Sequence, residues 1–206
     1  MPLVTVDHPL AAHLLAELRD RNTPPTEFRY LAHQLTIILA LEATRELATR
    51  DITVETPLEP TAARALAMPI AVVPILRAGL GMLEPFTTLF PDVAVGYIGL
   101  ERNEETAAAR EYYVKVPDLR GKVSFCVDPM LATGGSAAHA VTVMKTKGAE
   151  NIRMVCVVAA PEGVTALLAA HPDVTIFTAA LDRGLNERKY ILPGLGDFGD
   201  RLFATP

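Results

Sequence analysis

A carboxylate followed by a turn of small residues is the strongest chemical signal in this sequence. The segment directly follows an apolar run at 123–127 and reads Asp128, Pro129, Met130, Leu131, Ala132, Thr133, Gly134, Gly135, Ser136. Glycines let successive backbone N–H groups converge, and the helix that we expect to begin here favours an anion at its start. Thr133 and Ser136 offer hydroxyl donors, and Asp128 offers an acceptor for sugar hydroxyls. We predict a phosphate site; the alternative is an ordinary strand-to-helix turn with an N-cap.

Two arginines stand where other predicted strands end. Arg77 follows the apolar run at 70–76, and Arg102 follows the run at 93–100. Because ligands bind at the carboxyl ends of parallel strands, both guanidinium groups are placed to neutralise a phosphate-bearing group. The alternative for each arginine is a surface ion pair.

The elements that must position these residues alternate along the chain. Continuous apolar runs predict strands at 70–76, 93–100, 123–127, 152–159 and 174–180. Helices are predicted near 82–90, from the glycine turn to about 147, and after Pro161. This alternation indicates an α/β fold with a mostly parallel sheet flanked by helices on both faces.

Three further stretches lie outside that alternation. Residues 9–50 are predicted to be helical, with Thr23 as an N-cap and Pro24 in the first helical position. Residues 102–120 are charged and weakly periodic, and we interpret them as a loop, with 103–114 as a lid over the site. Residues 182–206 are predicted to form an irregular cap rich in Gly and Asp. With 206 residues, we expect one domain that comprises 1–50, a core at 51–181 and the cap.

Composition excludes several classes of function. The net charge of −5 argues against general nucleic-acid binding, which requires a broad basic face. The five histidines lack metal-ligand spacing, and the two cysteines lie in apolar runs without a C-x-x-C pair. No signal peptide is readable, and the apolar stretch at 65–76 is too short to span a bilayer. We therefore expect a cytoplasmic protein without a membrane partner.

The segment at 128–136 resembles the PRPP-binding loop of phosphoribosyltransferases, where PRPP is 5-phosphoribosyl 1-pyrophosphate. Most of these enzymes have a second acidic residue where this chain has Pro129, a departure that resembles the uracil phosphoribosyltransferase branch. Similar segments follow in the order expected for that family, at 73–82, 102–106, 159–163, 184–187 and 190–200.

The resemblance implies a phosphoribosyltransferase fold with a C-terminal hood and transfer of the 5-phosphoribosyl group of PRPP to uracil, giving UMP and pyrophosphate in pyrimidine salvage. It implies catalytic roles for Arg77, Arg102, Asp128 and Asp197, which also bind PRPP together with residues 129–136. Uracil recognition falls on Ile191, Gly196, Asp197 and Phe198, where Phe198 stands in place of the Ala of many bacterial members and is expected to narrow the pocket. Mg²⁺ is implied as a cofactor held mainly through PRPP, with no protein cage of ligands.

Two other functions remain open at this point. One is a phosphoribosyltransferase that acts on another nucleobase, and the other is a pyrimidine-responsive RNA-binding regulator of the same fold, against which the acidic composition speaks. PRPP and uracil are the expected partners, and we expect a homodimer or homotetramer. GTP activates some family members, although no residue pattern in this chain locates a GTP site.

Overall fold

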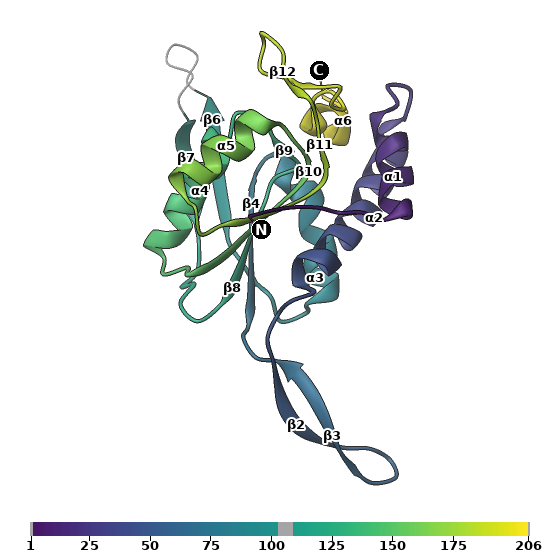
Figure 1. The fold of residues 1–206 in the computed structure, drawn as a ribbon, viewed down its shortest axis with the longest axis vertical. Coiled ribbons are helices and arrows are strands. Elements are labelled where there is room, and N and C mark those ends of the chain that lie inside the picture. The colour runs from purple at the N-terminus through teal and green to yellow at the C-terminus, as the bar shows by residue number, and fades with distance from the viewer. Residues whose placement is uncertain (1, 103–108, 206) are drawn as a thin grey trace.

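A mostly parallel sheet forms the centre of the computed structural model, which describes residues 2–102 and 109–205. Its strands lie in the order β1, β11, β10, β8, β4, β6, β7 (Figure 1). Their bounds are Leu3–Thr5 (β1), Thr175–Leu181 (β11), Asn151–Ala159 (β10), Val123–Val127 (β8), Ile70–Leu76 (β4), Tyr97–Arg102 (β6) and Ala109–Lys115 (β7). Every pairing along this path is parallel except that of β6 with β7. The predicted α/β class is confirmed.

Helices cover both faces of the sheet, which explains why its central strands are apolar without alternation. The bounds are Pro9–Arg19 (α1), Pro25–Thr44 (α2), Ala78–Met82 (the 3₁₀ turn η1), Leu83–Leu89 (α3), Gly135–Thr146 (α4), Pro161–Ala170 (α5) and Phe198–Phe203 (α6). In β4, Val72 packs into the core formed with α1, α2 and α3, whereas Val73 packs into the core formed with α4 and α5. Figure 1 shows these two groups of helices on opposite sides of the sheet.

Within the stretch at 9–50 that was predicted to be helical, the start and the end of the helix after Thr23 need correction. The residue that caps α2 is Pro24, the helix begins at Pro25, and the Thr23 hydroxyl instead donates to the Glu17 carbonyl at 2.6 Å. The prediction that helix continues to residue 50 is wrong. Residues Thr49–Glu55 form β2, which pairs antiparallel with β3 at Pro60–Leu66. This hairpin is mostly exposed and projects away from the sheet (Figure 1).

Two stretches predicted to be irregular contain regular structure. Part of the predicted loop at 102–120 is strand β7, which pairs with β6 from Tyr97↔Lys115 to Arg102↔Ala109 with one register shift. Residues 103–108 of the predicted lid lie outside the described residues. The cap at 182–206 contains the antiparallel pair β12 (Gly184–Leu185) and β13 (Ile191–Leu192), followed by α6.

Candidate functional site

One cavity of about 240 Å³ brings the predicted loop and the cap together. It lies at the carboxyl ends of β4 and β8, where the sheet meets the cap. Its lining consists of Ala78, Asp128, Met130, Ala132, Lys189, Tyr190, Ile191, Gly196, Asp197, Phe198 and Gly199. Residues more than sixty positions apart in sequence therefore border a single space. This is the ligand position expected for a parallel sheet.

Asp128 comes directly after β8, and its carboxyl group is the most perturbed acid at the cavity. The side chain is only partly exposed, and burial raises its pKa from 3.8 to about 7, against the opposing effect of a hydrogen bond from the Met130 backbone. The backbone is fixed because the Asp128 N–H donates to the Val155 carbonyl at 3.2 Å. A carboxyl group in a cleft whose pKa lies near 7 suits a partner that brings hydroxyl groups or positive charge.

The glycine turn is shaped by close packing against the start of α5. Gly134 caps α4 with φ +81°, and a Cβ at this position would lie 2.6 Å from the Gly163 carbonyl oxygen. A Cβ on Gly163 would in turn lie 2.5 Å from the Ala132 oxygen. Both positions therefore require glycine. The free N–H groups at the start of α4 lie directly after this turn, where Gly135 and Ser136 are exposed.

Arg77 and Asp128 follow the ends of neighbouring strands, β4 and β8, with Pro74 opposite Val127; Arg77 itself does not line the cavity. The Leu76–Arg77 peptide bond is cis, and the following turn approaches so closely that a Cβ on Gly79 would lie 2.6 Å from the Val127 oxygen. The Arg77 side chain is mostly exposed, and its Nη2 lies 3.4 Å from Asp200 Oδ1 of α6. This weak pairing leaves donors free for an anion.

Arg102 is the last residue of β6, whose Gly99 pairs with Leu76 of β4. Its backbone thus ends at the same edge of the sheet as Arg77. The Arg102 side chain lies outside the described part of the chain.

The cap contributes a tight loop between β13 and α6. Ile191 is buried, Gly196 has φ +83°, and Asp197 caps α6 by accepting from the Asp200 N–H at 2.9 Å. Gly196 and Asp197 are exposed toward the cavity they line. This part of the predicted site lies together.

Phe198 lines the cavity and also packs against α2. It borders the cavity, but its side chain is 1% exposed, and its ring packs edge-to-face on Phe28 of α2 at 5.0 Å between centroids. The ring therefore anchors the cap to α2, and its predicted narrowing of the pocket stays a prediction.

Sequence reasoning missed four residues that line the cavity, namely Ala78, Lys189, Tyr190 and Gly199. Ala78 follows Arg77 directly, and Lys189 and Tyr190 directly precede the predicted uracil residue Ile191. Lys189 has φ +65°, an uncommon backbone conformation for a residue other than glycine. A cation in a glycine-rich stretch was the available signal.

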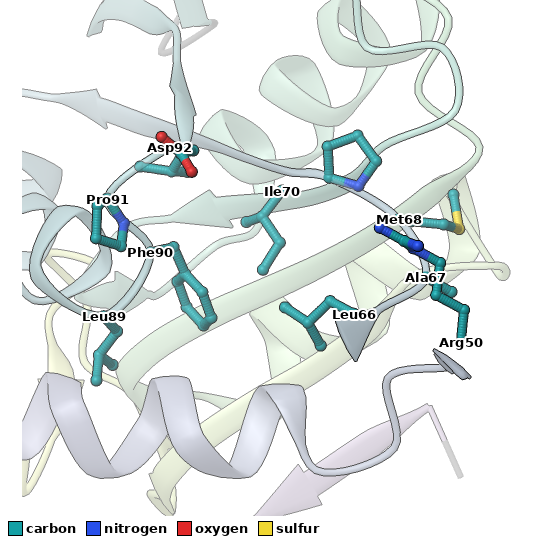
Figure 2. A pocket seen from close by; sticks show the side chains of 11 residues that line it. Arg50, Leu66, Ala67, Met68, Ile70, Leu89, Phe90, Pro91 and Asp92 are labelled. Carbon is teal, nitrogen blue, oxygen red and sulfur yellow. The ribbon is translucent and has the colours of Figure 1, made fainter. Parts of the chain in front are cut away.

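A larger cavity, of about 460 Å³, lies at the opposite end of β4 and does not include the predicted site residues. Leu66, Ile70 and Phe90 point into it from β3, β4 and the end of α3, with Arg50 and Asp92 at its edge (Figure 2). We assign the chemistry to the smaller cavity because Asp128, with its perturbed carboxyl group, lines it together with Met130 and Ala132 of the same loop; residues 133–136 of the glycine turn lie outside its lining.

No three His, Cys, Asp or Glu side chains of the described residues converge as a metal-binding group. Asp128 and Asp197 border the same cavity, and their carboxylate oxygens are donors that suit a hard cation such as Mg²⁺. Within residues 2–102 and 109–205, no helix is long and apolar enough to cross a membrane.

Comparisons with known proteins agree on one family. The family model described as uracil phosphoribosyltransferase matches residues 4–205. A uracil phosphoribosyltransferase of Dictyoglomus turgidum is 49% identical over 205 residues, covering 98% of this chain and 99% of the relative. One of Enterococcus faecalis is 48% identical over 202 residues, covering 97% of both chains.

Solved structures show the same architecture. A protein from Aquifex aeolicus superposes with a TM-score of 0.94 at 36% identity and covers 98% of both chains. A hypoxanthine-guanine phosphoribosyltransferase of Bacillus anthracis superposes with a TM-score of 0.53 at 13% identity, covering 77% of this chain and 80% of that one. The second likeness shows that the fold is that of phosphoribosyltransferases.

Proposed function

The chain belongs to the uracil phosphoribosyltransferase family, and from this premise we propose the role of each site residue in the reaction. The enzyme transfers the 5-phosphoribosyl group of PRPP to uracil, forming UMP and pyrophosphate. The observation that carries our assignment of residues is the single cavity lined by Asp128, by Met130 and Ala132 of the same loop, and by the cap loop.

Asp128 and the glycine turn bind the phosphoribosyl group in this proposal. The amides at the start of α4, with the hydroxyls of Thr133 and Ser136, donate to the 5-phosphate. Asp128 accepts from the ribose hydroxyls once it is ionised. The raised pKa supports this role, because hydroxyl donors and a nearby cation supply the stabilisation that the side chains around Asp128 do not.

Arg77 and Arg102 neutralise the pyrophosphate as it leaves C1 of the ribose. Support comes from their shared position at the ends of β4 and β6, where β4 lies between β6 and β8, the strand that Asp128 follows. Phosphoribosyltransferases generally use Mg²⁺ with PRPP, and when bound the ion supplies positive charge to the departing group. We propose that PRPP oxygens would hold it, with Asp128 and Asp197 as the carboxylates that line the cavity.

The cap loop presents uracil to C1. Ile191, Gly196, Asp197 and Phe198 offer backbone donors and acceptors at fixed positions, and Asp197 also faces PRPP. Bond formation from uracil N1 to C1, with release of pyrophosphate, then needs alignment of the two substrates more than a protein nucleophile. Water exclusion by the segment that follows Arg102 belongs to the same proposal.

We also propose a homo-oligomer. Tyr30 and Leu41 of α2 are 63% and 55% exposed, and the hairpin carries Leu58 at its tip, 94% exposed. We propose that these exposed apolar side chains contact another copy of the chain. Regulation by GTP stays a prediction from family resemblance.

The test is to incubate the protein with PRPP, Mg²⁺ and one nucleobase at a time, then identify the nucleotide by chromatography and mass. We expect UMP from uracil and little product from cytosine, hypoxanthine or guanine. Asp128→Asn is the matched control for loss of the site. A nucleotide formed faster from another base would overturn the assignment of uracil, and tight RNA binding in a filter assay without UMP formation would favour the regulator.

A further inference from the structure

Asp182 is a buried carboxylate for which the proposed reaction has no use. It lies just after β11, at the point where the chain enters the cap, and its side chain is 5% exposed. Arg19, the last residue of α1, donates to both carboxylate oxygens, from Nη2 at 2.6 Å and from Nη1 at 2.9 Å. A two-pronged pair of this kind fixes orientation as well as charge.

The pair also holds both backbone polar groups of one residue in the cap loop, the N–H and the carbonyl of Gly194. Asp182 Oδ2 accepts from the Gly194 N–H at 2.9 Å, and Arg19 Nη1 donates to the Gly194 carbonyl at 2.7 Å. Gly194 has φ +57°, and a Cβ there would lie 2.2 Å from the Ile191 carbonyl oxygen. The turn from Ile191 to Gly194 is therefore tight, and its position depends on these two polar contacts.

A second arginine, Arg201, holds the carbonyl of the next residue, Leu195. Arg201 donates to the Leu195 carbonyl at 2.7 Å and to the Asp20 carbonyl at 2.6 Å, so it ties the loop to the end of α1. Its guanidinium also lies over the Phe28 ring, 4.3 Å from the centroid. Successive carbonyls just before Gly196 are thus fixed to α1 by arginines.

We propose that Arg19 and Asp182 are positioning residues of the base site, holding the Gly194 peptide so that the loop at 195–198 presents its backbone groups to uracil. This inference rests on the proposed function, which places uracil against that loop. Neither side chain lines the cavity, so both act through Gly194. Among the described residues, neither side chain of the pair makes a hydrogen bond or ion pair with the PRPP loop at 128–136.

This arrangement predicts that loss of the pair weakens the binding of uracil but not the binding of PRPP. Loosening the Gly194 peptide displaces donors and acceptors that bind the base, while the phosphate loop keeps its packing on Gly163. A purely structural role would instead lower the fraction of folded enzyme, which reduces kcat and leaves both KM values unchanged.

The experiment compares steady-state kinetics of the full-length wild-type enzyme and Arg19→Met. Methionine keeps the aliphatic length of the side chain but removes its donors. We expect the KM for uracil to rise about tenfold, with the KM for PRPP within about twofold of wild type. The ratio of kcat/KM for uracil over cytosine should fall, because a loose loop discriminates less. Arg45→Met is the matched control, since it breaks an exposed pair with Glu42 of the same 2.6 Å length and should change neither KM.

Two further variants keep the test decisive if the unpaired buried Asp182 prevents folding. The double variant Arg19→Met with Asp182→Asn leaves no buried charge and should show the same selective rise. Arg19→Lys keeps the positive charge and should give an intermediate KM for uracil. Equal changes in both KM values, or none, in a folded variant would overturn the inference while UMP formation by wild type stands. Failure of wild type to form UMP would instead overturn the proposed function.

Discussion

Replacing Asp128 by Asn should stabilise the ligand-free protein while it removes activity. The folded pKa of about 7 lies above the ordinary value of 3.8, so the folded state binds a proton more tightly than the unfolded state. A carboxyl group with a raised pKa favours the folded state less and less as the pH rises from about 4 to about 7. Above that range, the ionisation of Asp128 in the cavity therefore lowers the free energy of unfolding.

The size of the effect follows from the two pKa values. Their separation of about three pH units corresponds to about 4 kcal/mol at pH 8, and to roughly 1.5–2 kcal/mol at pH 5. Asn keeps the shape and the acceptor for the Met130 N–H but carries no charge. We expect the gain in unfolding free energy of Asp128→Asn to be about 2–3 kcal/mol larger at pH 8 than at pH 5.

Urea unfolding of ligand-free wild type and variant at pH 5, 6.5 and 8 measures this gain. Asp92→Asn is the control, because Asp92 is exposed and its replacement should give no pH-dependent difference. In parallel, UMP formation should fall by at least about a hundredfold in Asp128→Asn. A gain independent of pH would refute the argument that burial holds this carboxyl group near neutrality, and wild-type turnover would refute its role with PRPP.

Three other outcomes are expected. Gly163→Ala should raise the KM for PRPP at least about fivefold, since its Cβ would meet the Ala132 oxygen at 2.5 Å and displace the phosphate loop; an unchanged KM would show that the loop adjusts freely. Phe198→Ala should lower the free energy of unfolding by about 3–5 kcal/mol through loss of the buried ring on Phe28, whereas Leu58→Ala at the hairpin tip should have little effect in urea titration. Uracil should be preferred to cytosine at least about thirtyfold in kcat/KM, because two mismatched backbone groups would each cost roughly 1–3 kcal/mol, and comparable values would exclude the cap loop as the reader of the base.

Several features could be predicted from local sequence. Strands β4 and β8 have the bounds expected from their apolar runs, because strands buried on both faces consist almost entirely of apolar residues, with Ser124 of β8 as the exception. The glycine turn after Asp128 was also readable, since only glycine allows the close approach that Gly134 makes to α5. Motif order then indicated the family, which the comparisons confirm.

Other features depend on partners distant in sequence. Strand β7 is charged and weakly periodic, so its strand conformation comes from pairing with β6 and not from its own pattern. The exposed hairpin β2–β3 likewise has no buried face to impose an apolar alternation on its residues.

The sequence by itself determined the parallel core, the glycine turn after Asp128 and the family, because each depends on short apolar runs or on glycines with a local steric reason. Only the tertiary structure decided that the Phe198 ring anchors the cap to α2, and that Arg19 reaches Asp182 and Gly194. These contacts join residues as many as 175 positions apart, and an arginine in a helix carries no local mark of its distant acceptor. The same limit applies to the pKa of Asp128, which the surrounding protein raises by excluding water.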